Sequence, residues 1–229
     1  MIQKVNLNID GAIVVAPKGS TVLDAALSSG ICIPHLCRVP YVSDLGSCRL
    51  CIVEHIKNGR TKITTSCTLL VQEGMRIQSN TEKIRKLRRN IAELLVAEAP
   101  NSRAVQDIAL RCGLESVRYP FRDSQCILCG RCIRACTGHF GEKPIGFVGR
   151  GKNRRVESPF ALKSELCHEC GRCIDLCPMT IGPCHGAFPP GEERLCGNCE
   201  SSMLTEEAAQ GHCISCHLGQ GFQCERAAA

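Results

Sequence analysis

The sequence is poor in aromatic residues: it has six phenylalanines, two tyrosines and no tryptophan among 229 residues. Proteins that bind single-stranded nucleic acids usually combine basic residues with aromatic side chains that stack on the bases. The basic loop of this chain, with Arg150, Lys152, Arg154 and Arg155, has no such aromatic residues between its charges. We therefore expect no nucleic-acid binding, although the formal net charge is +6.

Long apolar runs and nucleotide-binding motifs are also missing. No stretch approaches the roughly 18 consecutive apolar residues of a membrane span, and the first ten residues lack the charged start and apolar run of a secretory signal. There is no glycine-rich dinucleotide fingerprint, no phosphate loop and no nucleophile at a recognisable spacing from a base. The expectation is a cytoplasmic protein with no membrane span and no catalytic residues of its own.

Cysteine is abundant, with 20 residues. A chain of this length can form apolar cores, so it does not need disulfides as a short secreted scaffold does. In a reducing compartment, regularly spaced cysteines are more often metal ligands or catalytic thiols. The cysteine pattern therefore carries most of the functional information.

Residues 1–80 are predicted to form a small α+β unit. Two runs rich in β-branched residues flank Asp10-Gly11, which is a strong signal for a two-residue hairpin. Ser20 or Thr21 can cap a helix that ends near Gly30. The expected extended segments are residues 4–9, 12–15, 50–56 and 61–65.

Residues 81–120 are predicted to be a helical connector. Apolar residues at helical spacing follow Thr81 as the cap, and Pro100 lies just beyond the end. The opposite face is basic, which is typical of a solvated face, with a docking site for an acidic partner as the alternative. A second, weaker amphipathic segment covers 104–112. The expected apolar stripe is Ile84, Leu87, Ile91, Leu94 and Leu95, and the expected basic face is Lys83, Arg85, Lys86, Arg88 and Arg89.

Residues 121–190 contain two copies of one cysteine motif, and both copies include Cys-Gly-Arg-Cys-Ile. Three cysteines spaced by two residues can hold three corners of a four-iron cluster, and the fourth ligand then comes from the other copy. Zinc is a poor alternative, because it needs only four ligands in total. The predicted ligand sets are Cys126, Cys129, Cys132 and Cys177 for one 4Fe-4S cluster, and Cys136, Cys167, Cys170 and Cys173 for the other.

This segment resembles a bacterial-type ferredoxin with two 4Fe-4S clusters. The first copy departs from that pattern at Thr137, where proline often follows the fourth cysteine. That proline shapes a turn and is not a ligand, so the departure does not change the predicted ligands.

The N-terminal unit carries a lone Cys37, a Cys48-x2-Cys51 pair and a distant Cys67. A loop and a neighbouring strand can enclose a 2Fe-2S cluster with ligands in this order, although the plant-type spacing has four residues in the first gap and this chain has ten. Four buried structural thiols are the alternative. Together with Ile33-Pro34 and the stretch Ser47 to Glu54, the pattern resembles the 2Fe-2S domain of the complex I iron-sulfur large subunit and of NAD-linked iron-only hydrogenases. The resemblance implies a β-grasp fold.

The same families continue with a helix and a 4Fe-4S site formed by one histidine and three cysteines. Here the segment Ala99 to Arg103 contains neither residue type, although the sequence on both sides is similar to those families. We expect this cluster to be absent, with Cys112 left as a thiol in a helix.

The tail, residues 191–229, departs from those families. Two Cys-x2-Cys pairs at this separation are typical of a structural zinc ribbon, and the predicted zinc ligands are Cys196, Cys199, Cys213 and Cys216. A further iron-sulfur cluster is the main alternative, and covalent haem at the Cys213 to His217 pattern is a weaker one. The cysteines left without an assigned role are Cys32, Cys184 and Cys224.

The cofactors expected from these motifs transfer single electrons. The resemblance implies an electron-transfer subunit of a multi-subunit, flavin-dependent oxidoreductase, which passes electrons between an NAD(P)H-oxidising flavin subunit and ferredoxin or a second catalytic subunit. The reaction could be that of a bifurcating transhydrogenase, a hydrogenase or a formate dehydrogenase. The alternative is a freestanding multi-cluster ferredoxin that diffuses between enzymes.

Overall fold

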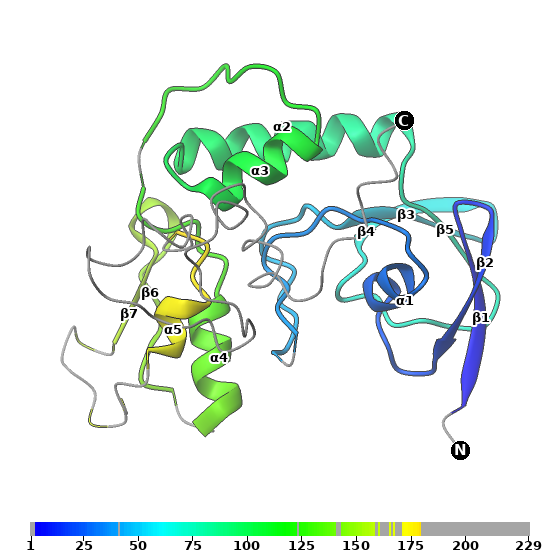
Figure 1. Ribbon diagram of the computed structural model, residues 1–229, viewed down its shortest axis with the longest axis horizontal. Helices are drawn as coiled ribbons and strands as arrows, with labels where there is room; N and C mark the ends of the chain where they lie inside the picture. Colours follow the sequence, from blue (N-terminus) through cyan, green and yellow to red (C-terminus); the bar gives the residue numbers. More distant parts are fainter. Residues whose placement is uncertain are drawn as a thin grey trace, which may run out of the picture.

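The computed structural model describes residues 3–40, 42–122, 124–140, 143–158, 160, 165, 167 and 171–179. They form a mixed α/β structure in which a five-stranded sheet with one helix lies beside two long helices and a smaller helical and hairpin region (Figure 1). The elements are β1 (Lys4–Ile9), β2 (Ala12–Pro17), α1 (Val22–Ser28), β3 (Ile52–Lys57), β4 (Arg60–Thr65), β5 (Met75–Gln78), α2 (Glu82–Glu98), α3 (Arg103–Arg111), α4 (Arg131–Phe140), β6 (Gly146–Val148), η1 (Gly151–Asn153), β7 (Arg155–Glu157) and α5 (Arg172–Asp175).

The large sheet has the strand order β2-β1-β5-β3-β4. Strand β5 lies at its centre, parallel to β1 and antiparallel to β3, and joins the two antiparallel hairpins. This is the topology of a β-grasp fold. The four residues of β5 were not predicted as a strand.

The first hairpin turns at Asp10 and Gly11, as predicted. Both residues have positive φ, 53° and 91°, as a tight hairpin turn requires, and the amide of Gly11 donates to Asn8 Oδ1 (3.0 Å). Asp10 also accepts from the amide of Ser79 (2.6 Å), which fixes the turn to the end of β5.

Helix α1 begins after Thr21, whose hydroxyl accepts from the amide of Asp24 (3.1 Å). Its apolar side packs on the sheet and buries Val22 and Leu23 completely. This first core also includes Cys51 and Cys67, two of the predicted cluster ligands.

Helix α2 begins after Thr81, as predicted, because the Thr81 hydroxyl accepts from the amide of Ile84 (3.2 Å). Two assignments of faces were wrong. Leu94, expected on the apolar stripe, is 54% exposed, and Arg88, expected on the basic face, is 5% exposed. Arg88 turns inward because main-chain carbonyls of the sheet domain accept its hydrogen bonds.

Helices α2 and α3 pack together over a second core. This core includes α2 and α3 residues such as Ala92 and Val105, together with Leu36, Leu50 and Cys129 from segments far apart in the sequence. The two helices therefore cover the place where the N-terminal loop meets the segment that leads into α4.

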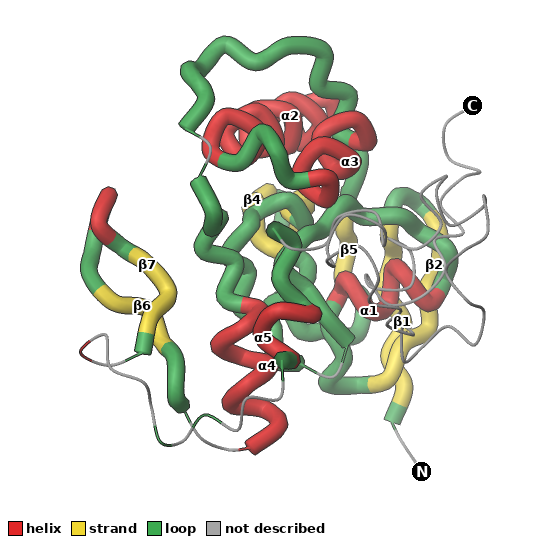
Figure 2. Tube along the Cα trace, turned by 60° about the vertical axis from the view of Figure 1, so that its left-hand side comes forward, coloured by secondary structure: helices red, strands yellow, loops and turns green. Residues whose placement is uncertain are grey.

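The region after residue 120 contains regular structure that was not predicted. Helices α4 and α5 pack side by side, and β6 pairs with β7 as a short hairpin (Figure 2). Gly130, directly before α4, has φ 70°, and Gly171, directly before α5, has φ 75°. The two copies of the cysteine motif thus start their helices in the same way.

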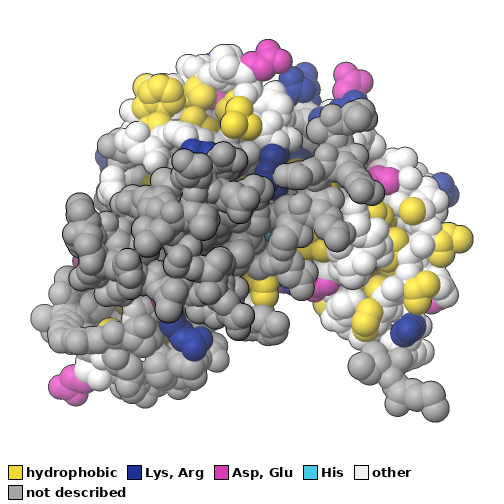
Figure 3. All heavy atoms as spheres, viewed as in Figure 1, with side chains coloured by type: hydrophobic (Ala, Val, Ile, Leu, Met, Phe, Trp, Pro, Cys, Tyr) yellow, Lys and Arg dark blue, Asp and Glu magenta, His cyan; other side chains and the backbone are white. Residues whose placement is uncertain are grey.

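Among the described residues, no helix is long and apolar enough to cross a membrane. On the face drawn in Figure 3, the described basic and acidic side chains are interspersed rather than gathered by sign.

Candidate metal centre

Four cysteines of the N-terminal domain lie close to the junction between the sheet and the loop before β3. Cys37 and Cys48 belong to that loop, Cys51 lies directly before β3, and Cys67 follows β4. All four are buried. Because β3 and β4 pair with Ile52 opposite Thr65, the residues just outside this register, Cys51 and Cys67, are brought to the same edge of the sheet.

The four thiols interact as two pairs. The Cys37 amide donates to Cys48 Sγ (3.4 Å), and a hydrogen bond from the Cys48 thiol lowers the pKa of Cys37 to about 5. Likewise, a hydrogen bond from Cys67 lowers the pKa of Cys51 to about 7. The pKa values of Cys48 and Cys67 rise in return, because each keeps the shared proton beside a thiolate.

Two pairs of thiols suit a two-iron cluster, in which each iron takes two protein ligands. Among the described residues, no three His, Cys, Asp or Glu side chains are grouped so that they could hold a metal ion. As two pairs, the thiols could supply the ligands of a 2Fe-2S cluster, with Cys37 and Cys48 for one iron and Cys51 and Cys67 for the other.

Arg88 of α2 holds the backbone beside this site. Its Nε donates to the Leu50 carbonyl (2.9 Å) and its Nη2 to the Ile52 carbonyl (2.6 Å), on either side of Cys51. The serine beside Cys67 adds a second restraint, since the Ser66 hydroxyl donates to the Cys51 carbonyl (2.8 Å). Such outer contacts orient metal ligands.

A second group of thiols lies at the start of α4. The thiols predicted for the first 4Fe-4S cluster are close enough to affect one another, because Cys126 and Cys177 both help to raise the pKa values of Cys129 and Cys132. Burial is the largest cause, and it raises the pKa of Cys132 to about 11. The amide of Leu128 donates to Cys126 Sγ (3.3 Å), and main-chain donors of this kind stabilise thiolate ligands.

A direct hydrogen bond joins the segments that carry the two groups of thiols. The Ser47 hydroxyl, next to Cys48, donates to the main-chain carbonyl of Cys129 (3.2 Å). From α4, Arg134 Nη2 donates to the Cys37 carbonyl (2.6 Å), and Arg134 Nη1 donates to the Ser43 carbonyl. The loop of the first group is thus bonded to the segment of the second.

The arginines that join the two groups were missed by the sequence analysis. Arg131 and Arg134 are three residues apart on α4 and are both buried. Arginine is rarely buried, and nothing in the motif marks it as inward-facing. For Arg131, the available signal was the arginine shared by both copies of Cys-Gly-Arg-Cys-Ile.

The second predicted 4Fe-4S set is described only in part. Cys136 lies on α4 and Cys173 on α5, which pack together, and Cys167 is exposed. Cys170 lies outside the described residues, as do all four predicted zinc ligands and both Cys184 and Cys224.

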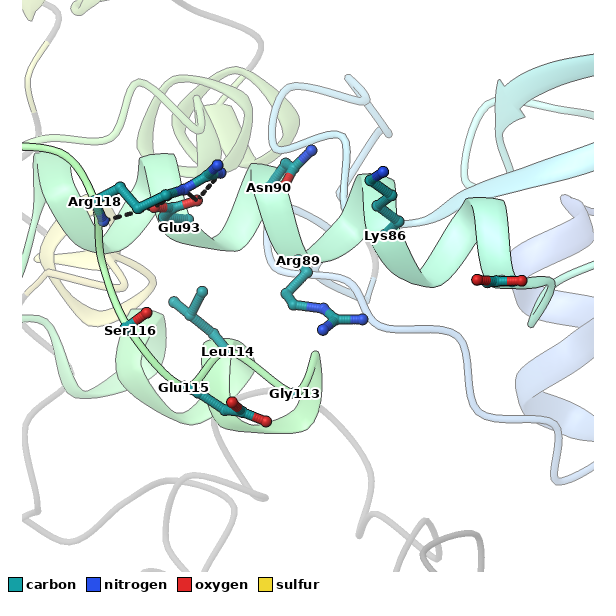
Figure 4. Close-up of a pocket in the computed structure, with 10 residues that line it drawn as sticks. Lys86, Arg89, Asn90, Glu93, Gly113, Leu114, Glu115, Ser116 and Arg118 are labelled. Carbon is teal, nitrogen blue, oxygen red and sulfur yellow. Dashed lines mark hydrogen bonds and ion pairs between the residues drawn. The ribbon is translucent and has the colours of Figure 1, made fainter.

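A polar groove lies between α2 and the segment after α3, with a volume of about 340 Å³ (Figure 4). The ion pair of Glu93 and Arg118 (2.6 Å) lies at one end, and Lys86, Arg89 and Glu115 also line the groove. None of its lining residues is a cysteine or histidine, so the groove is separate from the candidate cluster sites.

Comparison with known protein families agrees with these two groups of thiols. Residues 3–82 match the model of a 2Fe-2S iron-sulfur cluster binding domain, and residues 125–181 match a 4Fe-4S dicluster domain. The chain is 34% identical to a chain in the crystal structure of an NAD+-reducing [NiFe]-hydrogenase in the H2-reduced state, with a TM-score of 0.58 over 67% of this chain and 74% of that one. The chain belongs to this family of iron-sulfur electron-transfer subunits.

Some relatives of this chain are much longer proteins. The chain is 31% identical to the NADH-ubiquinone oxidoreductase 75 kDa subunit of Reclinomonas americana and to the NADPH-Fe(3+) oxidoreductase subunit alpha of Geobacter sulfurreducens. Each alignment covers 76% of this chain but only 28% and 23% of the relative. The chain thus spans about a quarter of the length of these relatives. The predicted resemblance to the complex I subunit and to NAD-linked hydrogenases is confirmed.

Proposed function

We propose that this iron-sulfur subunit relays single electrons within a cytoplasmic, multi-subunit flavin-dependent oxidoreductase. When bound, iron-sulfur clusters supply one-electron transfer, and the protein sets their spacing and potentials. The residues we assign to this role are Cys37, Cys48, Cys51 and Cys67 for a 2Fe-2S cluster, Cys126, Cys129, Cys132 and Cys177 for one 4Fe-4S cluster, and Cys136, Cys167, Cys170 and Cys173 for a second.

The observation that carries the proposal is the hydrogen bond from Ser47 to the Cys129 carbonyl (3.2 Å). Ser47 is the neighbour of Cys48, and Cys129 belongs to the other thiol group. One hydrogen bond therefore links the backbone of two proposed ligand sets. The bond holds the two proposed ligand sets next to each other, as a relay between their clusters requires, whereas a carrier with independent sites would not need it.

The proposed partners follow from the named activities of the relatives. These names include NADH, NADPH and NAD+ as electron donors or acceptors. We assign the nucleotide chemistry to a separate flavin-containing subunit and the other end of the relay to ferredoxin or a second catalytic subunit. Electron bifurcation is one form that such an assembly could take.

The proposed organisation has four parts: the 2Fe-2S domain over 1–80, a connector over 81–120, the 4Fe-4S domain over 121–190 and a zinc-binding tail over 191–229. The connector holds no cluster in this proposal. Its short link between α2 and α3 buries Ala99, and the Ser102 hydroxyl donates to the Pro178 carbonyl (2.9 Å), so ordinary packing occupies this region.

The proposal predicts ten irons per chain, two from one cluster and four from each of the others. Anaerobically purified protein should show this iron content, and reduction by dithionite should give electron paramagnetic resonance signals of both cluster types. Clearly more than ten irons would contradict the proposed cluster set. The same sample should carry zinc by elemental analysis, and its absence would remove zinc from the tail.

The division of labour has its own test. The reduced chain alone should not reduce NAD+, but it should do so when its flavin-containing partner is added. NAD+ reduction without added flavin would contradict the proposal. A native species near 24.9 kDa in size-exclusion chromatography of the source cells would instead favour a freestanding ferredoxin.

A further inference from the structure

Arg131 is a buried cation at the junction of the two thiol groups. Its side chain is 1% exposed, and the residue lies between Cys129 and Cys132 in the sequence. A charged side chain taken out of water is destabilised unless other charges or hydrogen bonds compensate it. The groups that compensate Arg131 therefore show what the residue does.

Main-chain carbonyls from both sides of the junction accept the hydrogen bonds of Arg131. Its Nη2 donates to the Leu36 carbonyl, beside Cys37, and lies 3.5 Å from the Arg38 carbonyl. Its Nη1 donates to the Leu176 carbonyl, beside Cys177 (3.4 Å). One guanidinium group thus bonds to the neighbours of two proposed ligands, one in each cluster.

In the described part of the chain, no acidic side chain pairs with the charge of Arg131. Its Nε is buried with no acceptor among the described residues. Burial has the largest effect and lowers the pKa of Arg131, whereas the nearby Cys129, Cys37 and Cys48 act against it and favour the positive charge. Arg134 is the nearby cation that opposes it.

We infer that the buried positive charge of Arg131 raises the reduction potentials of both clusters proposed at the junction. The inference rests on the proposed function, because the negative charge that we expect to offset Arg131 belongs to thiolate-ligated clusters at the two sites. Each one-electron reduction adds one negative charge and changes no covalent bond of the protein. A buried positive charge stabilises that added charge, so the reduced state is favoured.

The second copy of the motif provides a matched control. Arg172 occupies the same place in Cys-Gly-Arg-Cys-Ile and follows a glycine with nearly the same φ as Gly130, yet its side chain is exposed. Solvent screens an exposed charge. The same substitution at Arg131 and Arg172 therefore separates the effect of a buried charge from the effect of the motif itself.

The test is a redox titration of the full chain, monitored by electron paramagnetic resonance, for the wild type and the variants R131M, R131K and R172M. We expect R131M to shift the reduction equilibrium of the 2Fe-2S cluster at least tenfold toward the oxidised state, which is about 59 mV for a one-electron couple. R131K, which keeps the charge, and R172M should each shift it less than threefold. The first 4Fe-4S cluster should shift in the same direction as the 2Fe-2S cluster.

R131Q keeps amide donors for the carbonyl groups and replaces R131M in the comparison if R131M does not assemble. An unchanged potential in the neutral variant at full iron content would overturn the inference. Equal shifts in R131K and the neutral variant would also overturn it, because geometry rather than charge would then be the cause. If the wild type lacks the cluster signals, the proposed function fails instead, and iron content reports this separately.

Discussion

The hydroxyl of Ser47 donates to the carbonyl of Cys129 although 82 residues separate them in the sequence. The contact joins the loop before β3 to the turn before α4, directly beside two proposed cluster ligands. The packing at this junction allows several predictions that substitutions can test.

Gly130→Ala should disturb the junction more than Gly171→Ala. Both glycines have φ near 70°, so alanine is strained at either position. A Cβ at Gly130 would also lie 3.0 Å from Leu45 Cδ2 and 3.1 Å from Phe147 Cζ, whereas a Cβ at Gly171 would have no described atom within 4 Å. Thermal unfolding followed by circular dichroism should show the larger loss of stability for Gly130→Ala, and equal losses would contradict the packing argument.

Cys48→Ala should remove the 2Fe-2S cluster and leave eight irons per chain. Cys48 is paired with Cys37 in the buried loop, so its loss leaves one proposed iron with a single protein ligand. Cys112→Ala is the control, because Cys112 caps α3 and burial raises the pKa of its thiol. Iron content and visible circular dichroism should remain at wild-type values in Cys112→Ala, and a loss of irons there would show that Cys112 is a ligand.

Arg88→Ala should destabilise the protein by about 3 kcal/mol, because two buried carbonyls lose their charged donor. The carbonyls of Leu50 and Ile52 flank Cys51, so the 2Fe-2S cluster should also be released faster by a chelator. Arg89→Ala, on the exposed side of the same helix, should change the stability by less than about 0.5 kcal/mol. Urea titration measures the unfolding free energy of both variants. Similar losses of stability in Arg88→Ala and Arg89→Ala would contradict the structural role of Arg88.

Glu93 should make stability depend on acidic pH. Hydrogen bonds from Arg118 lower the pKa of Glu93 below its usual value of 4.5. A carboxyl with a lowered pKa contributes full stability above the unfolded value and loses it as pH falls through the folded value. The stability difference between wild type and Glu93→Gln should therefore be constant from pH 7 to about 5 and shrink below 4.5.

Urea unfolding at a series of pH values measures this difference. Glu115→Gln is the control, since Glu115 is exposed on the same groove and has no ion pair among the described residues. A difference between wild type and Glu93→Gln that persists unchanged below pH 4 would contradict the assignment.

Elements with local signals were predictable from the sequence. The turn at Asp10 and Gly11 and the cap at Thr81 depend on residues within a few positions of each other, and both lie where expected. Strand β5 was missed because four residues with only Met75 and Ile77 as apolar positions give little alternation, and its partners are distant in sequence. Helix α4 was missed because the glycine and cysteines of the motif suggested a loop.

The site predicted from the sequence lacked the residues that join its two groups of cysteines. Cysteine spacing grouped the thiols, because each motif is continuous in the sequence. It could not show that Arg131 is buried while Arg172 is exposed, since both lie in the same five-residue segment, Cys-Gly-Arg-Cys-Ile. That difference comes from tertiary contacts with Leu36 and Leu176, which no local pattern encodes.

The central position of β5 bears on the order of folding during synthesis. Strand β1 pairs with β5, so the first strand made must wait for residues 75–78 before the sheet can close. By then all four cysteines of the N-terminal site, the last of them Cys67, have already been synthesised. A nascent chain therefore passes through a stage in which all four thiols have been made and the sheet has not yet closed around them.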